Sequence, residues 1–155
     1  IFFRGFAMPP RYIIEQLDTE VFPWALLEFK HIVTEIDPSQ VLFTNVPNSA
    51  DVDKLQPLGC GICPESIQVD TAKYGRICVL DPRAPEVLMP QDADAFDCLV
   101  FGGILGNHPM DGRTERELTS HLAKAARRHL GELQMTTDTA VLVTHRILHD
   151  QVPFD

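Results

Sequence analysis

Four short apolar runs constrain the fold of this 155-residue chain more than any other feature. They are RYIIEQ (11–16), VLFTNV (41–46), RICVLDP (76–82) and CLVFGG (98–103). Strands that are apolar along their whole length are typical of parallel sheets, because helices cover both faces of such sheets. Helical patterns lie between these runs, so the sequence predicts an α/β fold with a parallel sheet and helices on both faces.

Spacing of apolar residues predicts three of the helices. Residues 21–33 repeat apolar side chains at helical intervals, and an Asp-Pro pair stops the pattern at Pro38. We expect Trp24 on this amphipathic helix to belong to the core. A short helix is predicted for residues 90–97 and a last helix for residues 138–149, whereas residues 47–75 are expected to be mostly loop.

A further helix is predicted from its end signals. Thr114 and Glu117 have the spacing of a capping box, in which each side chain accepts a hydrogen bond from the other residue's free backbone N–H. The helix is expected to run from there to Leu130, with Gly131 as its C-cap. The basic residues Lys124, Arg127, Arg128 and His129 then form a solvated helix face near its C-terminus.

Charge and hydropathy limit the partners. Thirteen basic and 22 acidic side chains give a net charge of −9, which argues against a surface that grips nucleic acid phosphates but permits a basic protein as partner. No apolar run approaches the roughly 20 residues of a membrane helix. We expect a cytoplasmic protein with an N-terminal extension (1–10) and one domain (11–155).

Four cysteines raise the question of a metal or redox site. Cys60 and Cys63 form a C-x-x-C pair, which is either half a zinc site or a redox pair if it is functional. Cys78 and Cys98 lie singly in apolar runs, where buried strands hold cysteine as a small hydrophobic residue. We therefore expect reduced loop thiols at 60 and 63 and no metal.

The stretch CLVFGGILGNHPMDGRTEREL (98–118) joins an apolar strand to a glycine-rich loop. A dinucleotide fingerprint needs three glycines, but Phe101 stands where the first would be if Gly103 and Gly106 were the second and third. The P-loop pattern fails as well, because no Lys-Ser or Lys-Thr follows Gly106. The glycines alone leave a ligand site and a structural turn equally plausible.

A second loop favours the ligand. Thr136, Thr137 and Thr139 surround Asp138 at the expected start of the last helix, although a helix cap needs only one of them. Ligands of parallel α/β sheets bind beyond the carboxyl ends of the strands. The loops 80–84, 102–114 and 130–140 are expected at that edge, so the extra hydroxyls indicate a polar small molecule there.

Together these segments resemble the SPOUT methyltransferases. The motif LGELQMTTDTAV is similar to the last motif of that family, and YIIEQ, LDPRA, VFGGILG-N-HP and QMTTDTA resemble its branch of ribosomal-protein arginine N-methyltransferases, typified by a yeast enzyme. The resemblance covers residues 11–155. It implies a C-terminal trefoil knot, S-adenosylmethionine as cofactor and a ribosomal-protein arginine as methyl acceptor, with the oligomeric state, monomer or knot-mediated homodimer, left open.

The resemblance also assigns site residues by position. The cofactor-binding residues implied are Leu80, Asp81, Pro82, Arg83, Gly102, Gly103, Ile104, Leu105, Gly106, Leu130, Gly131, Leu133, Gln134, Met135, Thr136, Thr137 and Thr139. Adenine needs a narrow apolar slot, which Leu105, Leu133 and Met135 are suited to wall. The glycines allow the backbone to approach the rest of the cofactor.

Carboxylates are the candidates for orienting the acceptor, because an arginine side chain stays protonated and pairs with them. We expect Glu15 and Asp111 in this role, while Arg113 either pairs with the cofactor carboxylate or anchors its own loop. Asp138 is alternatively a helix N-terminal acid. At position 107 this chain has Asn where relatives are expected to have an acid, and it stops at QVPFD, where relatives continue.

Three other functions stay open from the sequence. One is RNA methylation, which the acidic composition disfavours. Another is binding of S-adenosylmethionine without catalysis, suggested by Asn107 and by the missing C-terminal tail. The third is a structural domain without a ligand.

Overall fold

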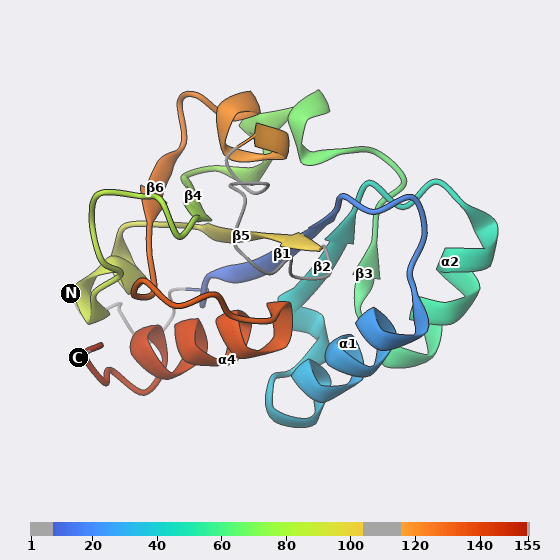
Figure 1. The fold of residues 1–155 in the computed structure, drawn as a ribbon, viewed down its shortest axis with the longest axis horizontal. Helices are drawn as coiled ribbons and strands as arrows, with labels where there is room; N and C mark the ends of the chain where they lie inside the picture. Colours follow the sequence, from blue (N-terminus) through green and yellow to red (C-terminus); the bar gives the residue numbers. More distant parts are fainter. Residues whose placement is uncertain (1–7, 104–115, 155) are drawn as a thin grey trace.

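A six-stranded parallel sheet organises the part of the chain that the computed structural model describes, residues 8–103 and 116–154. The strands are β1 (Arg11–Gln16), β2 (Val41–Thr44), β3 (Gly61–Ile62), β4 (Ile77–Leu80), β5 (Cys98–Gly103) and β6 (Ala126–Arg128). Their order across the sheet is β3-β2-β1-β5-β4-β6, and every neighbouring pair is parallel (Figure 1). The predicted parallel sheet is confirmed.

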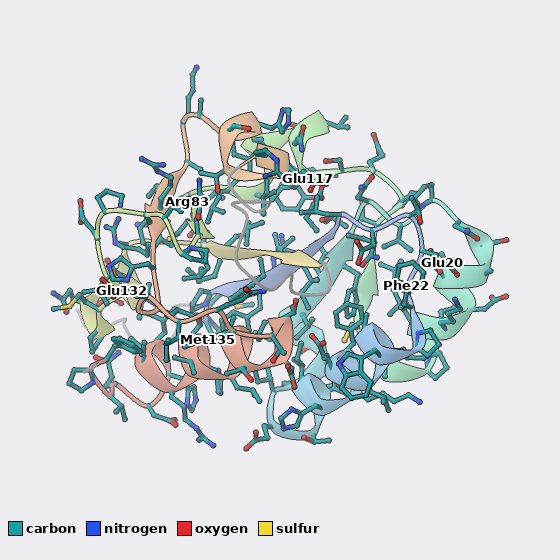
Figure 2. The ribbon with its side chains drawn as sticks, viewed as in Figure 1. Glu20, Phe22, Arg83, Glu117, Glu132 and Met135 are labelled. Atoms are coloured by element: carbon teal, nitrogen blue, oxygen red, sulfur yellow. The ribbon has the colours of Figure 1, made fainter. Side chains whose placement is uncertain are left out.

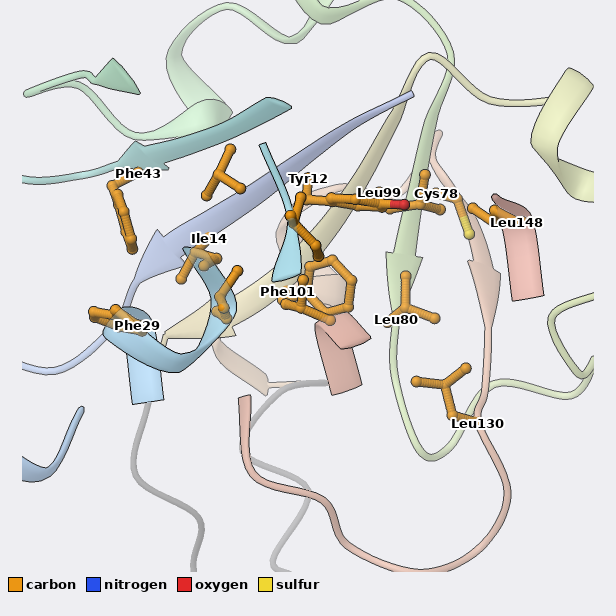
Figure 3. Packing of buried hydrophobic residues seen from close by; sticks show 14 of the residues in the cluster. Tyr12, Ile14, Phe29, Phe43, Cys78, Leu80, Leu99, Phe101, Leu130 and Leu148 are labelled. Atoms are coloured by element: carbon orange, nitrogen blue, oxygen red, sulfur yellow. The ribbon is translucent and has the colours of Figure 1, made fainter. Parts of the chain in front are cut away.

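Helices cover one face of this sheet. Helix α1 (Pro23–Glu35) and helix α4 (Thr137–Leu148) lie side by side beneath it in Figure 1, and α2 (Ser49–Leu55) lies toward the β3 edge. Pro23 suits the first turn of α1, where its missing N–H would have no helical partner. Figure 3 shows the core on this face, where Phe29 of α1 packs against Phe43 of β2 at a ring-centroid distance of 4.9 Å.

Short 3₁₀ turns, rather than long helices, cover the other face within the described residues. They are η4 (Ile67–Val69), η5 (Thr71–Tyr74) and η7 (Thr119–His121). Ile67, Tyr74 and neighbouring leucines pack there on side chains of the central strands. The predicted helical layer is thus confirmed for one face, and on the other face the residues described between 66 and 74 and between 118 and 122 form turns.

The predicted helix from Thr114 to Leu130 is wrong over its second half, and Thr114 lies outside the described residues. Residues 126–128 form β6, which pairs with β4 so that Val79 lies beside Arg127. Alanine and arginine are good helix formers, but pairing satisfies backbone groups that β4 would otherwise expose at the sheet edge. The predicted C-cap Gly131 instead follows a strand, with a φ of 91° that suits glycine.

Several smaller predictions need correction. Residues 47–75 contain α2, β3 and the turns η3 (Gln56–Leu58), η4 and η5, with the Asn48 side chain capping α2 by accepting from Ala50 N–H at 2.8 Å. The predicted helix 90–97 is a 3₁₀ turn, η6 (Pro90–Asp94), and η2 (Pro38–Gln40) follows α1. Trp24 is not in the core, because 65% of its surface is exposed.

The helices of this fold were compared with the length and hydropathy of a membrane-spanning helix. Among the described residues, no helix combines the length and the hydropathy needed to cross a bilayer.

Candidate functional site

The described parts of the three predicted cofactor-binding segments, residues 80–83, 102–103 and 130–139, lie at the carboxyl edge of the sheet. Parallel strands end at one edge, and β5 and β4 are neighbours. The backbone N–H of Asp81, just after β4, donates to the carbonyl of Arg128 at 2.9 Å. The hydroxyl of Thr137, at the start of α4, donates to the carbonyl of Gly102 at 3.2 Å. Hydrogen bonds therefore tie segment 80–83 to the end of β6 and segment 130–139 to the end of β5.

Segment 80–83 is a turn built around a buried carboxylate. One oxygen of Asp81 accepts from the Arg83 backbone N–H at 2.9 Å, and the other accepts from the Thr119 hydroxyl at 2.7 Å. Asp81 is only 2% exposed, so its side chain points into the protein. Pro82 and Arg83 lie on the exposed side of the turn, and Figure 2 labels Arg83 there.

Segment 102–106 is described only at its first two residues, and Ile104, Leu105 and Gly106 lie outside the described part. Gly103 ends β5 in a tight position, because a Cβ added to it would stand 3.1 Å from the carbonyl oxygen of Glu15. Its own carbonyl accepts from Leu17 N–H at 3.2 Å. The end of β5 is thus held closely against β1.

Segment 130–139 carries an apolar side and a polar side. Leu130 is buried and Met135 packs on the core, whereas Leu133 is 82% exposed and Gln134 is also exposed. Gly131 donates its backbone N–H to Nδ1 of His129 at 3.0 Å. Figure 2 labels Glu132 and Met135 on this connection, which runs from β6 to α4.

The start of α4 is held by polar contacts. The Thr136 hydroxyl lies 2.5 Å from Oδ1 of Asp138 and 3.0 Å from Oγ1 of Thr139, while Oδ2 of Asp138 lies 2.7 Å from Nδ1 of His31. Burial alone would raise the pKa of Asp138. The hydrogen bonds from His31, Thr136 and the Thr139 backbone outweigh it and hold this pKa below its usual value. Asp138 is therefore an ionised helix-start acid.

The loop offers donors suited to S-adenosylmethionine. The structure gives no hydrogen bond from the backbone N–H groups of Leu133, Gln134 and Met135 to any described residue. A heterocycle with acceptor nitrogens and apolar faces matches such a strip, where N–H groups without a partner among the described residues adjoin an exposed leucine and a half-buried methionine. The described residues thus fit the implied cofactor.

Glu15 is buried at the end of β1. It is 1% exposed, and its Oε1 accepts from the Thr44 hydroxyl at 2.6 Å and from the Ile67 N–H at 3.0 Å. Its Oε2 accepts from the Ser66 hydroxyl. The carboxylate therefore joins β1, β2 and η4. The other two residues expected in catalysis, Asp111 and Arg113, lie outside the described part of the chain.

Sequence reasoning missed Glu28, Thr119 and His31. Glu28 accepts from the Thr137 backbone N–H at 3.2 Å, although it lies on α1 far from the predicted loops in sequence. One signal was present: Glu28 is a charged residue on a helix face that also carries Ala25 and Phe29. For Thr119 and His31, no local pattern indicated a contact with Asp81 or Asp138.

Cys60 and Cys63 belong to no metal-ligating cluster among the described residues. Cys60 and Cys63 flank the two-residue strand β3, and residues three apart along a strand point to opposite faces. Both are free thiols, and burial raises the pKa of Cys60 to about 11. Cys78 and Cys98 are buried as predicted. The described residues hold no cluster of His, Cys, Asp or Glu that would ligate a metal.

The expected basic helix face is absent because residues 126–128 form β6. Nε of Arg128 lies 3.3 Å from Oδ2 of Asp92, and its guanidinium stacks over Phe96 at 5.3 Å. This arginine therefore serves an internal ion pair rather than an open phosphate-binding surface.

Comparison with known proteins first defines the fold class. A dual-specific Trm10 structure from Thermococcus kodakaraensis superposes with a TM-score of 0.72 at 15% identity, covering 92% of this chain and 94% of that one. At that identity the likeness concerns the fold alone. The crystal structure of the yeast arginine methyltransferase SFM1 complexed with SAM (S-adenosylmethionine) superposes more closely. Its TM-score is 0.85 at 35% identity, covering 98% of this chain and 73% of that one.

The sequence comparisons then define the family. Protein arginine N-methyltransferase SFM1 of Saccharomyces cerevisiae is 37% identical over 157 residues, which cover 94% of this chain and 74% of the yeast protein. The model of the family described as protein arginine N-methyltransferase SFM1-like matches residues 11–155. The chain belongs to this SFM1-like family of protein arginine N-methyltransferases, and the resemblance found in its motifs is confirmed.

Proposed function

We propose that this protein is an S-adenosylmethionine-dependent methyltransferase that modifies arginine in a protein. The observation that carries the proposal is the family match over residues 11–155, since it includes all three segments expected to bind the cofactor. A relative with 35% identity and a TM-score of 0.85 was solved in complex with SAM. The contact of segment 130–139 with the end of β5, and the place of segment 80–83 at the end of the neighbouring strand β4, support the same site.

The chain's residues would bind and align the reactants. S-adenosylmethionine supplies an activated methyl group on its sulfonium. Segments 80–83, 102–106 and 130–139 would hold the cofactor through backbone groups, because Asp81 and Thr137 already use their side chains within the protein. Alignment of two bound reactants can lower a barrier by about 7–11 kcal/mol, so rigid loops suit this chemistry.

Glu15 and Asp111 are proposed to orient the acceptor arginine. Glu15 is the member of this pair in the described part of the chain, and three protein donors occupy its oxygens. Ser66 is half-buried, whereas the other two donors, Thr44 and Ile67, are buried. A guanidinium would therefore replace the Ser66 hydroxyl on Oε2, while Thr44 and Ile67 keep the carboxylate in place. Arg113 is proposed to pair with the cofactor carboxylate or to anchor its loop.

The proposed acceptor is a ribosomal-protein arginine in the cytoplasm. A net charge of −9 favours a basic protein as partner over nucleic acid. We further propose that residues 11–155 form one domain with the trefoil knot of the SPOUT fold, preceded by an extension at 1–10. RNA methylation is the alternative, and the ion pairing of Arg128 with Asp92 argues against a phosphate-binding role for that arginine.

Transfer of a labelled methyl group from S-adenosylmethionine tests the proposal. Purified ribosomal protein and ribosomal RNA are offered separately, and the label is expected in arginine of the protein fraction. Label in RNA alone would support the alternative, and binding without transfer to either would favour a non-catalytic protein.

The proposed role of Glu15 is tested in the same assay with Glu15→Gln and Ser66→Ala. Glu15→Gln should lose most transfer and keep cofactor binding, because it removes the charge that holds the guanidinium. Ser66→Ala keeps that charge and should retain transfer. Wild-type transfer by folded Glu15→Gln would reject the role.

A further inference from the structure

Helix α1 carries a carboxylate at a buried position. Glu28 is 8% exposed and shares its helix face with the buried residues Ala25, Phe29 and Ile32. A charged group in such a place is costly unless it is paired or hydrogen-bonded. Its partners therefore show what the residue does.

The partner of Glu28 is the start of α4. Its Oε1 accepts from the backbone N–H of Thr137, the first residue of α4, at 3.2 Å. The N-cap residue Thr136 gives no side-chain cap, because its hydroxyl is directed to Asp138 and Thr139. Glu28 thus supplies from another helix the acceptor that an N-cap side chain usually supplies, and its charge suits the positive end of the helix dipole.

Two opposing influences act on the ionisation of Glu28. Burial and the nearby charge of Asp138 raise the pKa of Glu28 above its usual value, because the hydrogen bonds from the backbone N–H groups of Thr137 and Asp138 lower it by less. The carboxylate is therefore in direct electrostatic contact with the first turn of α4.

The contact continues to the end of β5. The hydroxyl of Thr137 donates to the carbonyl of Gly102 at 3.2 Å, so Thr137 joins α1 on its backbone side and β5 on its side-chain side. His31 lies one helical turn after Glu28 and contacts Asp138 at 2.7 Å, but it is 51% exposed. Of these two contacts between α1 and the start of α4, the one made by Glu28 is buried, and the two helices lie side by side in Figure 1.

We propose that Glu28 is a positioning residue for methyl transfer, which fixes the start of α4 against Gly102 at the end of β5 and so holds segment 130–139 in place at that edge of the sheet. The inference rests on the proposed function, because that segment is part of the proposed cofactor cradle. Glu28 would act through Thr137 and would not touch the cofactor itself. Its loss should therefore weaken cofactor binding without affecting the protein acceptor.

Two variants at position 28 distinguish the effect of the hydrogen-bond acceptor from the effect of its charge. Glu28→Ala removes the acceptor, and Glu28→Gln keeps an amide oxygen at the same distance but loses the charge. Glu35→Gln is the matched control, since Glu35 lies on the same helix, is 41% exposed and pairs with Arg146 in the last turn of α4 at 3.1 Å rather than with the start of that helix. Hydrogen bonds to charged groups are worth enough to change an equilibrium about tenfold or more.

The readouts are calorimetric binding of S-adenosylmethionine to folded protein and the two KM values in the methyl-transfer assay. In Glu28→Ala the Kd and KM for S-adenosylmethionine should rise about tenfold, and in Glu28→Gln by less, with the KM for the protein acceptor unchanged. Glu35→Gln should match the wild type. If Glu28→Ala does not fold, Glu28→Gln at a temperature well below its Tm decides the question.

Two outcomes overturn the inference. Wild-type affinity for S-adenosylmethionine in the variants, with only Tm lowered, would show that Glu28 serves stability alone and would leave the proposed function intact. Wild-type protein that binds no S-adenosylmethionine would overturn the proposed function and this inference together.

Discussion

Replacing Gly103 by alanine should destabilise the end of β5. The added Cβ would stand 3.0 Å from Oε1 of Gln16, 3.0 Å from Cγ2 of Ile14 and 3.1 Å from the carbonyl oxygen of Glu15. None of these atoms can move easily. Ile14 is fully buried, the Glu15 carbonyl belongs to β1, and the Gln16 amide donates to the Glu20 carbonyl at 3.0 Å.

Two effects set the size of the change. Overpacking of a filled site costs about 1–3 kcal/mol. Alanine also has less conformational freedom than glycine in the unfolded chain, which stabilises the folded protein by about 0.4–1 kcal/mol. The free energy of unfolding should therefore fall by about 1–2 kcal/mol, which corresponds to a Tm lower by about 2–8 °C in a chain of this size.

Gly61→Ala is the matched control, because both glycines lie in strands. The Cβ added at Gly61 would meet Cδ1 of Leu42 at 2.9 Å, the end of a flexible side chain that can turn aside. Urea unfolding of both variants should show a lower midpoint for Gly103→Ala alone, with an unchanged m-value. A Gly103→Ala midpoint equal to those of the wild type and the control would refute the packing argument.

The remaining predictions concern individual side chains. Thr119→Val should lower the free energy of unfolding by about 1–3 kcal/mol in urea titrations, since buried Asp81 loses a donor at 2.7 Å; an unchanged midpoint would contradict this. Burial and His149 lower the pKa of His145 from 6.5, so the unfolded chain binds a proton that the folded protein does not. Stability should therefore be fully present above pH 6.5 and fall as the pH drops below it, and His145→Gln should show a shallower fall between pH 7 and 5.5. The raised pKa of Cys60, about 11, predicts slow alkylation at pH 8 in folded protein and fast alkylation in urea, and equal rates would contradict it.

Local patterns predicted the central strands well. The run 98–103 is β5 to the residue, because a continuous apolar segment that ends in two glycines suits a buried strand and its exit. Predictions failed where contacts with residues distant in the sequence determine the secondary structure. Residues 126–128 have helix-forming side chains, yet they pair with β4, about 50 residues earlier in the chain. The seven-residue helix α2 was missed because it is short and carries few apolar residues.

The candidate site shows the same division. The positions of segments 80–83 and 130–139 followed from motifs that lie at strand and helix ends. The burial of Glu15 did not, because its donors Ser66 and Ile67 come from a turn about 50 residues later. Glu28 was visible as a charge on an apolar face, but only the structure shows that α1 and α4 meet there.

Calorimetric titration of the folded wild-type protein with S-adenosylmethionine tests the central claim most directly, because every proposed role depends on a cofactor site at the carboxyl edge of the sheet. Saturable binding of one molecule per chain is predicted, together with a Tm that rises with ligand concentration. Folded protein that releases no heat of binding and shows no shift in Tm at millimolar S-adenosylmethionine would contradict the account.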